Sequence, residues 1–62
     1  MKHHFEIKLQ SDLVGYSATA SDVKGSGLRY DTKYCNSERE ATQEILAKLR
    51  SETYNDFTYY ML

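Results

Sequence analysis

The sequence predicts a two-layer α+β domain in which one amphipathic helix packs on an antiparallel sheet. Three observations lead to this fold class. Apolar and polar side chains alternate through most of residues 3–35, the spacing becomes helical after residue 36, and an aromatic segment ends the chain. The predicted order is β-β-β-α-β: a three-stranded antiparallel sheet, one helix and a C-terminal strand. The sheet and the helix each have one apolar face, and these faces are buried by packing on each other. At 62 residues, the chain is expected to form a single domain, 1–62.

Residues 3–10 and 16–21 are the first two expected strands. Both alternate with a period of two, which is typical of strands buried on one face only. Between them, Asp12 and Gly15 supply the side-chain hydrogen bonding and the permissive φ of a turn. The residues expected to face inward are Phe5, Ile7, Leu9, Tyr16, Ala18 and Ala20.

A flexible loop and a third strand follow. Residues 22–27 contain two of the three glycines of the chain, which favours a loop between antiparallel strands. Alternation then resumes over residues 28–35. It places Leu28, Tyr30, Thr32 and Tyr34 on one face and Arg29, Asp31, Lys33 and Cys35 on the other.

The helix has a clear start. Ser37 is followed three residues later by Glu40, which matches the capping box, and Glu38 and Glu40 suit the positive end of the helix dipole. An apolar stripe at helical spacing consists of Ala41, Ile45, Leu46 and Leu49. The expected core of the domain comprises Phe5, Ile7, Leu9, Tyr16, Ala18, Leu28, Tyr30, Ala41, Ile45, Leu49 and Phe57.

The last segment, residues 57–62, is expected to be a strand with apolar side chains on both faces. Such a strand either lies in the centre of the sheet or has one face covered by another chain. Both alternatives are open from the sequence.

Composition excludes several classes of protein. The chain is 40% hydrophobic and has eight basic and nine acidic residues, which does not fit a disordered chain or a general nucleic-acid binder. No apolar run approaches the roughly 18 residues of a membrane span, so no membrane association is expected. No apolar segment follows Lys2 as a secretory signal would require. With Cys35 unpaired, a cytoplasmic location is expected.

Catalytic, cofactor and metal sites are not predicted. His3 and His4 are adjacent, so in a strand they face opposite ways and cannot share an ion. Cys35 precedes a helix N-terminus, where the pKa of a thiol can fall, but a chain of this size has little room for a catalytic pocket. A space-filling role for Cys35 is therefore favoured over a reactive one, and the protein is not expected to be an enzyme.

Protein binding is the favoured function. Six tyrosines and two phenylalanines exceed what so thin a core can bury, and tyrosines left at a surface are typical of interfaces. The alternative is that several of them only shield the edge of the core, with their hydroxyls in water. The expected role is an accessory regulator or inhibitor that dimerises by pairing an edge strand across a two-fold axis and binds a partner protein. The predicted partner-binding residues are Phe57, Tyr59, Tyr60, Leu62 and Tyr34.

DNA binding through the sheet is the alternative function. The outer face is expected to present Lys8, Arg29 and Lys33, and the topology resembles the arm-binding N-terminal domain of tyrosine recombinases, which lays its sheet in the major groove. Glu6 and Asp31 interrupt the basic cluster, and phosphate contacts supply most of the affinity in such complexes. Nucleic acid is therefore a possible but disfavoured partner.

A family resemblance supports the regulatory interpretation. Over residues 5–49 the chain resembles the small HicB-like antitoxin domain, and the resemblance implies a dimerising module that neutralises a partner protein, of the kind carried by phages and mobile elements. The motifs that carry it are Phe5-Glu6-Ile7, Gly15-Tyr16-Ser17-Ala18, Lys24-Gly25-Ser26-Gly27 and the helix start Glu40-Ala41.

Overall fold

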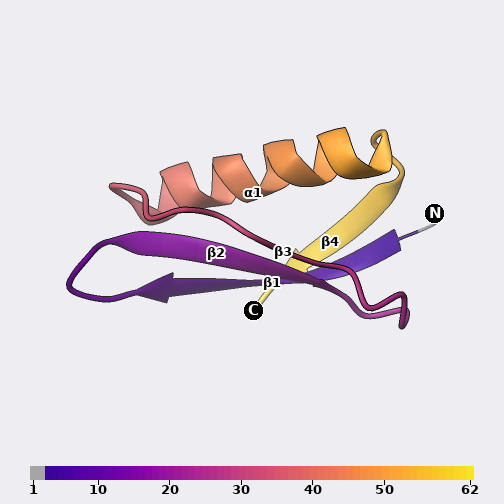
Figure 1. Ribbon diagram of the computed structural model, residues 1–62, viewed down its shortest axis with the longest axis horizontal. Coiled ribbons are helices and arrows are strands. Elements are labelled where there is room, and N and C mark those ends of the chain that lie inside the picture. Colours follow the sequence, from indigo (N-terminus) through magenta and orange to yellow (C-terminus); the bar gives the residue numbers. More distant parts are fainter. Residues whose placement is uncertain (1–2) are drawn as a thin grey trace.

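The computed structural model describes residues 3–62 and confirms the predicted α+β class and element order. Strands β1 (His3–Ser11), β2 (Tyr16–Asp22) and β3 (Arg29–Asp31) precede the helix α1 (Glu38–Thr53), and strand β4 (Phe57–Met61) follows it. The four strands form one sheet in the order β3-β2-β1-β4, and α1 lies along one face of it (Figure 1). The pairs β1–β2 and β2–β3 are antiparallel, whereas β1–β4 is parallel.

Both ends of α1 are capped. The Ser37 side chain accepts a hydrogen bond from the N–H of Glu40 at 3.1 Å, as the capping box requires. At the other end, Tyr54 adopts a left-handed conformation with φ 53° and ψ 42°, and its N–H bonds to the carbonyl of Arg50. Asn55 is also left-handed, so the chain reverses sharply and enters β4 parallel to β1.

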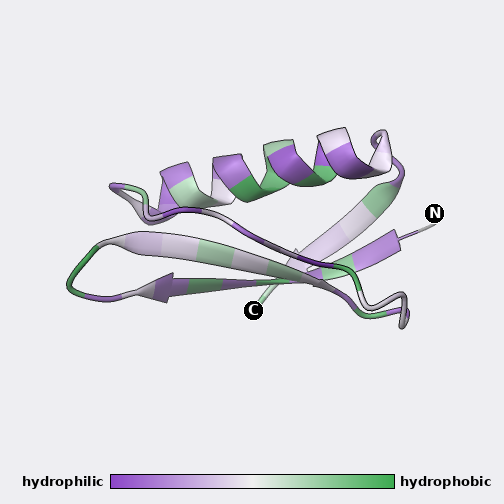
Figure 2. Ribbon diagram, in the orientation of Figure 1, coloured by the Kyte–Doolittle hydropathy of each residue, from purple (hydrophilic) through white to green (hydrophobic). Residues whose placement is uncertain are grey.

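The core lies between α1 and the inner face of the sheet, where hydropathic colouring shows apolar residues on the lower side of the helix (Figure 2). The alanines Ala18 and Ala20 of β2 leave room for the helix to approach, and α1 packs more against β2 than against the other strands. The buried apolar side chains are Phe5, Ile7, Ala18, Ala20, Cys35, Ala41, Ile45 and Leu49. Those that pack partly buried against them are Leu9, Tyr16, Tyr30, Leu46 and Phe57.

Two parts of the third predicted strand differ from the structure. Leu28 was expected in the core, but it lies before β3 and is 36% exposed, because regular pairing begins only at Arg29. After Asp31, β3 ends, and the Thr32 hydroxyl accepts a hydrogen bond from the N–H of Ala18. The chain pairs with β2 again only at an isolated bridge between Tyr16 and Cys35.

This interruption inserts an extra residue and reverses which side chains face inward. The N–H of Thr32 bonds to the carbonyl of Ala18, so between that contact and the Tyr16–Cys35 bridge two residues, 33 and 34, face the single residue 17. An extra residue of this kind shifts the alternation by one, as in a β-bulge. Cys35 therefore points into the core and Tyr34 is exposed, the reverse of the two faces that alternation over residues 28–35 assigns.

Candidate protein-binding edge

Strand β4 forms one edge of the sheet, which excludes the first of the two alternatives for residues 57–62, a central position in the sheet. It pairs with β1 in a parallel register that aligns Phe5 with Tyr59 and Ile7 with Met61. Just beyond β4, the N–H of Leu62 donates to the carbonyl of Ile7 at 2.8 Å. The backbone N–H and C=O groups of successive strand residues point to opposite sides in the plane of the sheet. Because Leu62 faces β1, Thr58 and Tyr60 also direct their backbone groups to β1. The N–H and C=O groups of Phe57, Tyr59 and Met61 therefore point to the open edge, on the side of β4 away from β1.

The inner face of β4 is only partly covered. Phe57 is half-buried, with its ring centroid 6.1 Å from that of Phe5 in an edge-to-face arrangement. Tyr59 and Met61 continue along the same face and are 43% and 40% exposed. These side chains are exposed because α1 packs chiefly on β2, while β4 runs obliquely away from α1 toward the C-terminus (Figure 1).

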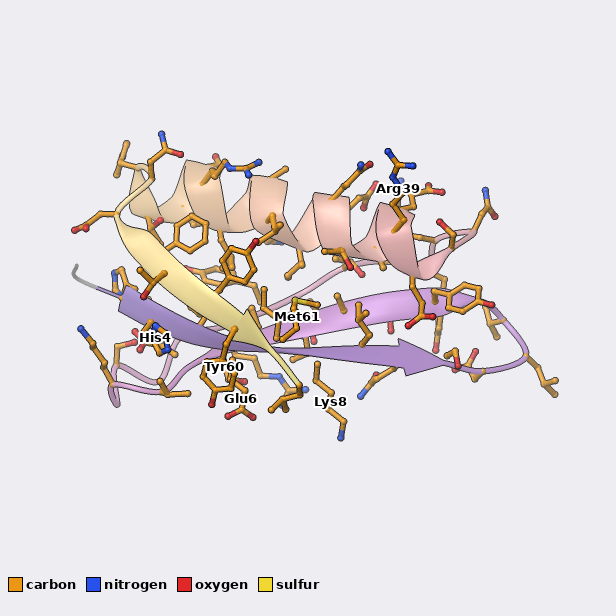
Figure 3. The ribbon with its side chains drawn as sticks, turned by 180° about the vertical axis from the view of Figure 1, so that it is seen from behind. His4, Glu6, Lys8, Arg39, Tyr60 and Met61 are labelled. Carbon is orange, nitrogen blue, oxygen red and sulfur yellow. The ribbon has the colours of Figure 1, made fainter. Side chains whose placement is uncertain are left out.

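On the outer face, β4 is fastened to β1 by polar contacts. The Tyr60 hydroxyl donates to the Glu6 carboxylate at 2.8 Å, and the rings of Tyr60 and His4 lie 5.4 Å apart (Figure 3). The hydrogen bond to Glu6 raises the pKa of the Tyr60 phenol, so the hydroxyl remains a donor at neutral pH. His4 Nδ1 also hydrogen-bonds the hydroxyl of Thr58. These contacts fasten β4 to β1, while the other edge of β4 has no neighbouring strand.

The two edges of the sheet differ in charge. Residues 57–62 contain no charged side chain and no proline. By contrast, β3 is only three residues long and carries Arg29 and Asp31, whose charged groups lie 3.8 Å apart. Short length, charge and proline are the usual devices that keep an edge strand from pairing with another chain. β3 has two of them, and β4 has none.

The structure brings four of the five predicted partner-binding residues together on or next to β4: Phe57, Tyr59, Tyr60 and Leu62. Tyr34 is separate, because it follows β3 at the opposite edge, where its hydroxyl donates to Asp12 Oδ2 at 3.1 Å. Two exposed residues near the edge were missed. Met61 continues the inner face of β4, and Tyr54 is 91% exposed at the end of α1. The expected alternation of residues 57–62 could have identified Met61.

The basic residues of the DNA-binding alternative are not gathered in one place. Lys8 and Arg29 border a shallow hollow on the outer face, together with the acidic Glu6. Lys33 instead borders a hollow between β3 and α1, with Glu44 and Lys48. Each hollow mixes both signs of charge, so DNA binding stays a prediction without a geometric argument in its favour.

Cys35, Glu40 and Glu44 form a cluster that sequence spacing did not reveal. The cysteine follows β3 and the glutamates lie on the first turns of α1, and one ligand atom from each lies within 4.8 Å of the others. Burial, followed by the charges of Glu44 and Glu40, raises the pKa of the Cys35 thiol. A thiol that keeps its proton is a poor nucleophile. Burial and the raised pKa therefore favour a space-filling role for Cys35 over a reactive one.

His3 also meets Asp22 and Ser26, although it is far from both of them in the sequence. His3 Nδ1 lies 2.8 Å from Asp22 Oδ2, and the Ser26 hydroxyl donates to the same oxygen at 2.5 Å. The hydrogen bond from Ser26, followed by those from His3 and the Lys24 N–H, holds the pKa of the Asp22 carboxyl well below its usual range. A nucleophilic triad needs the serine to donate to the imidazole. Here it donates to the carboxylate, so these contacts fasten the β2–β3 loop to β1.

Comparisons with known proteins add no homologue to this description. No family model matches the chain, and no characterised protein or solved structure matches it either. The resemblance to the HicB-like antitoxin domain thus stays a prediction. Within residues 3–62, the single helix is too short and too polar to cross a membrane.

Proposed function

We propose that this domain is a protein-binding module that takes up a strand of its partner at the open edge of β4. One observation carries the proposal: the edge strand has outward backbone groups at Phe57, Tyr59 and Met61 and none of the usual protection against pairing. Addition of a strand to an exposed sheet edge is a common mode of protein recognition, in which main-chain hydrogen bonds supply affinity.

The side chains of β4 suit this mode of binding. A partner strand beside β4 would cover Tyr59 and Met61 on the inner face and Tyr60 and Leu62 on the outer face, all of which are exposed in the isolated chain. Tyrosine buries a large apolar area at a small entropic cost and is enriched at the centres of interfaces. The strand is already held by β1, so little ordering is required when a partner binds.

The biological role that follows is regulation of the partner protein. A domain of this kind changes the activity of its partner by covering part of the partner's surface, as small accessory regulators and inhibitors do. The HicB-like resemblance leads to the same role, with a toxin-like protein as the partner. The proposal requires no catalytic group.

Proline substitutions test the edge directly. Tyr59→Pro removes one outward N–H of β4 and leaves the bonds to β1 in place, because proline is tolerated on the open side of an edge strand. Arg29→Pro makes the same change on β3 and serves as the matched control. Immobilised wild-type protein and Arg29→Pro are expected to retain the same proteins from a cell extract, while Tyr59→Pro loses them. Equal retention by all three proteins would refute the proposal, provided that circular dichroism shows each variant folded.

A further inference from the structure

We propose that the strand received by the β4 edge is β4 of a second copy of this chain, antiparallel and with Tyr59 on the two-fold axis. This inference rests on the proposed function, and it names a second copy, in place of the toxin-like protein that the HicB-like resemblance suggests, as the partner at that edge. The result is a dimer whose two sheets join into one continuous sheet, with both helices on the same face.

The backbone of β4 is self-complementary in one register. Its outward groups belong to Phe57, Tyr59 and Met61, which are evenly spaced about Tyr59. In an antiparallel pair centred there, Tyr59 faces Tyr59 of the second copy and Phe57 faces Met61 of the second copy. All three positions then become hydrogen-bonded pairs, each exchanging both N–H···O bonds. A shift of the register by two residues would leave one outward residue of each copy unpaired.

The side chains fit the same register. On the inner face, Phe57 lies against Met61 of the second copy, and the two Tyr59 rings meet beside the helices. On the outer face, Thr58 lies opposite Tyr60 of the second copy. None of these pairs is charged, and the whole chain has a net charge of only −1, so two copies repel each other weakly. An uncharged strand cannot form ion pairs with a charged partner strand. A second copy of β4 is itself uncharged, so no charged side chain is left without an ion-pair partner.

The size of the core favours a second copy as well. The largest fully buried side chains of the described residues are Phe5, Ile7, Ile45 and Leu49. Domains of about 60 residues bury only about 60% of the surface of the unfolded chain, and association is a common further source of stability. Pairing at β4 places a second set of apolar side chains where α1 does not reach, and so extends the core across the axis.

Charge complementation at position 59 tests the two-fold axis. Wild-type protein is expected to sediment at twice its 7.2 kDa mass at micromolar concentration. Tyr59→Lys and Tyr59→Glu each place two like charges opposite one another and should weaken self-association at least ~10-fold. An equimolar mixture of the two variants should restore the dimer, because Lys then faces Glu. Failure of the mixture to associate, with both variants folded, would overturn the register.

Disulfide trapping provides a second measurement. With Cys35→Ala as background, Tyr59→Cys is expected to give a covalent dimer in a glutathione buffer, because hydrogen-bonded strand pairs have Cα atoms about 5.5 Å apart. Tyr60→Cys is the matched control, since its copies lie diagonally at about 7–8 Å and should stay largely unlinked. Equal linking at both positions contradicts the proposal. A monomeric wild type refutes self-pairing alone, and loss of extract proteins by Tyr59→Pro would then still support the proposed function.

Discussion

Replacement of Tyr54 by glycine should stabilise the domain. Tyr54 ends α1 with φ 53° and ψ 42°, a conformation that costs a residue with a Cβ about 1–2 kcal/mol. Glycine adopts it without that cost but loses about 0.5–1 kcal/mol through the greater freedom of the unfolded chain. The Tyr54 side chain is 91% exposed, so its removal uncovers little apolar surface. The expected net gain in the free energy of unfolding is about 0.5–1 kcal/mol.

The gain can be measured by thermal and urea unfolding followed by far-ultraviolet circular dichroism, at one protein concentration because association would add stability. For a domain of this size it corresponds to a rise in Tm of about 2–8 °C. Tyr54→Ala is the control, since it removes the same ring and keeps the Cβ, and it should stay within about 0.5 kcal/mol of wild type. A Tyr54→Gly protein less stable than wild type, or an alanine variant that gains as much, would refute the reasoning.

Three further changes probe the rest of the fold. Ile45 is fully buried on the face of α1 that packs against the sheet, so Ile45→Ala should lower the free energy of unfolding by about 2–5 kcal/mol and Ile45→Val by only about 0.5–1.5 kcal/mol. Similar urea midpoints for the two variants would contradict this packing. Gly15→Ala should also destabilise the domain, because its Cβ would lie 2.8 Å from the Cys35 carbonyl oxygen and φ is +154°; an unchanged thermal midpoint would speak against that close approach. Asp22 accepts a hydrogen bond from Ser26, which keeps the pKa of its carboxyl in the folded protein below the value in the unfolded chain. The ionised Asp22 carboxylate therefore contributes fully to stability above about pH 4, and this contribution is lost as the pH falls through the pKa of the folded protein. Urea titrations across acidic pH should therefore show a smaller acid-induced loss for Asp22→Asn than for wild type, and parallel curves would count against this role.

Local periodicity predicted most of the elements. Alternation around Phe5 and Ile7 identified β1, and the same pattern around Ala18 identified β2. The Ser37 cap and the Ile45 stripe identified α1. These signals are readable because each depends on neighbours a few residues away.

The candidate site was predicted less completely. The aromatic run after residue 56 predicted partner-binding residues there, and the structure places Tyr59 and Tyr60 on opposite faces of β4. Tyr34 was grouped with them on composition alone, but it lies at the other edge of the sheet. A shared residue type says nothing about which strands become neighbours.

The open edge of the sheet and the inward position of Cys35 could not be read from local patterns. The parallel pairing of β4 with β1 and the extra residue that turns Cys35 inward both depend on contacts between segments far apart in the chain. Backbone hydrogen bonds between strands are alike for nearly every residue type, so they leave little trace in the sequence. Local alternation along the chain therefore establishes which faces of the strands and the helix are apolar. The order of the strands, which depends on long-range pairing, leaves the uncharged strand β4 at the edge.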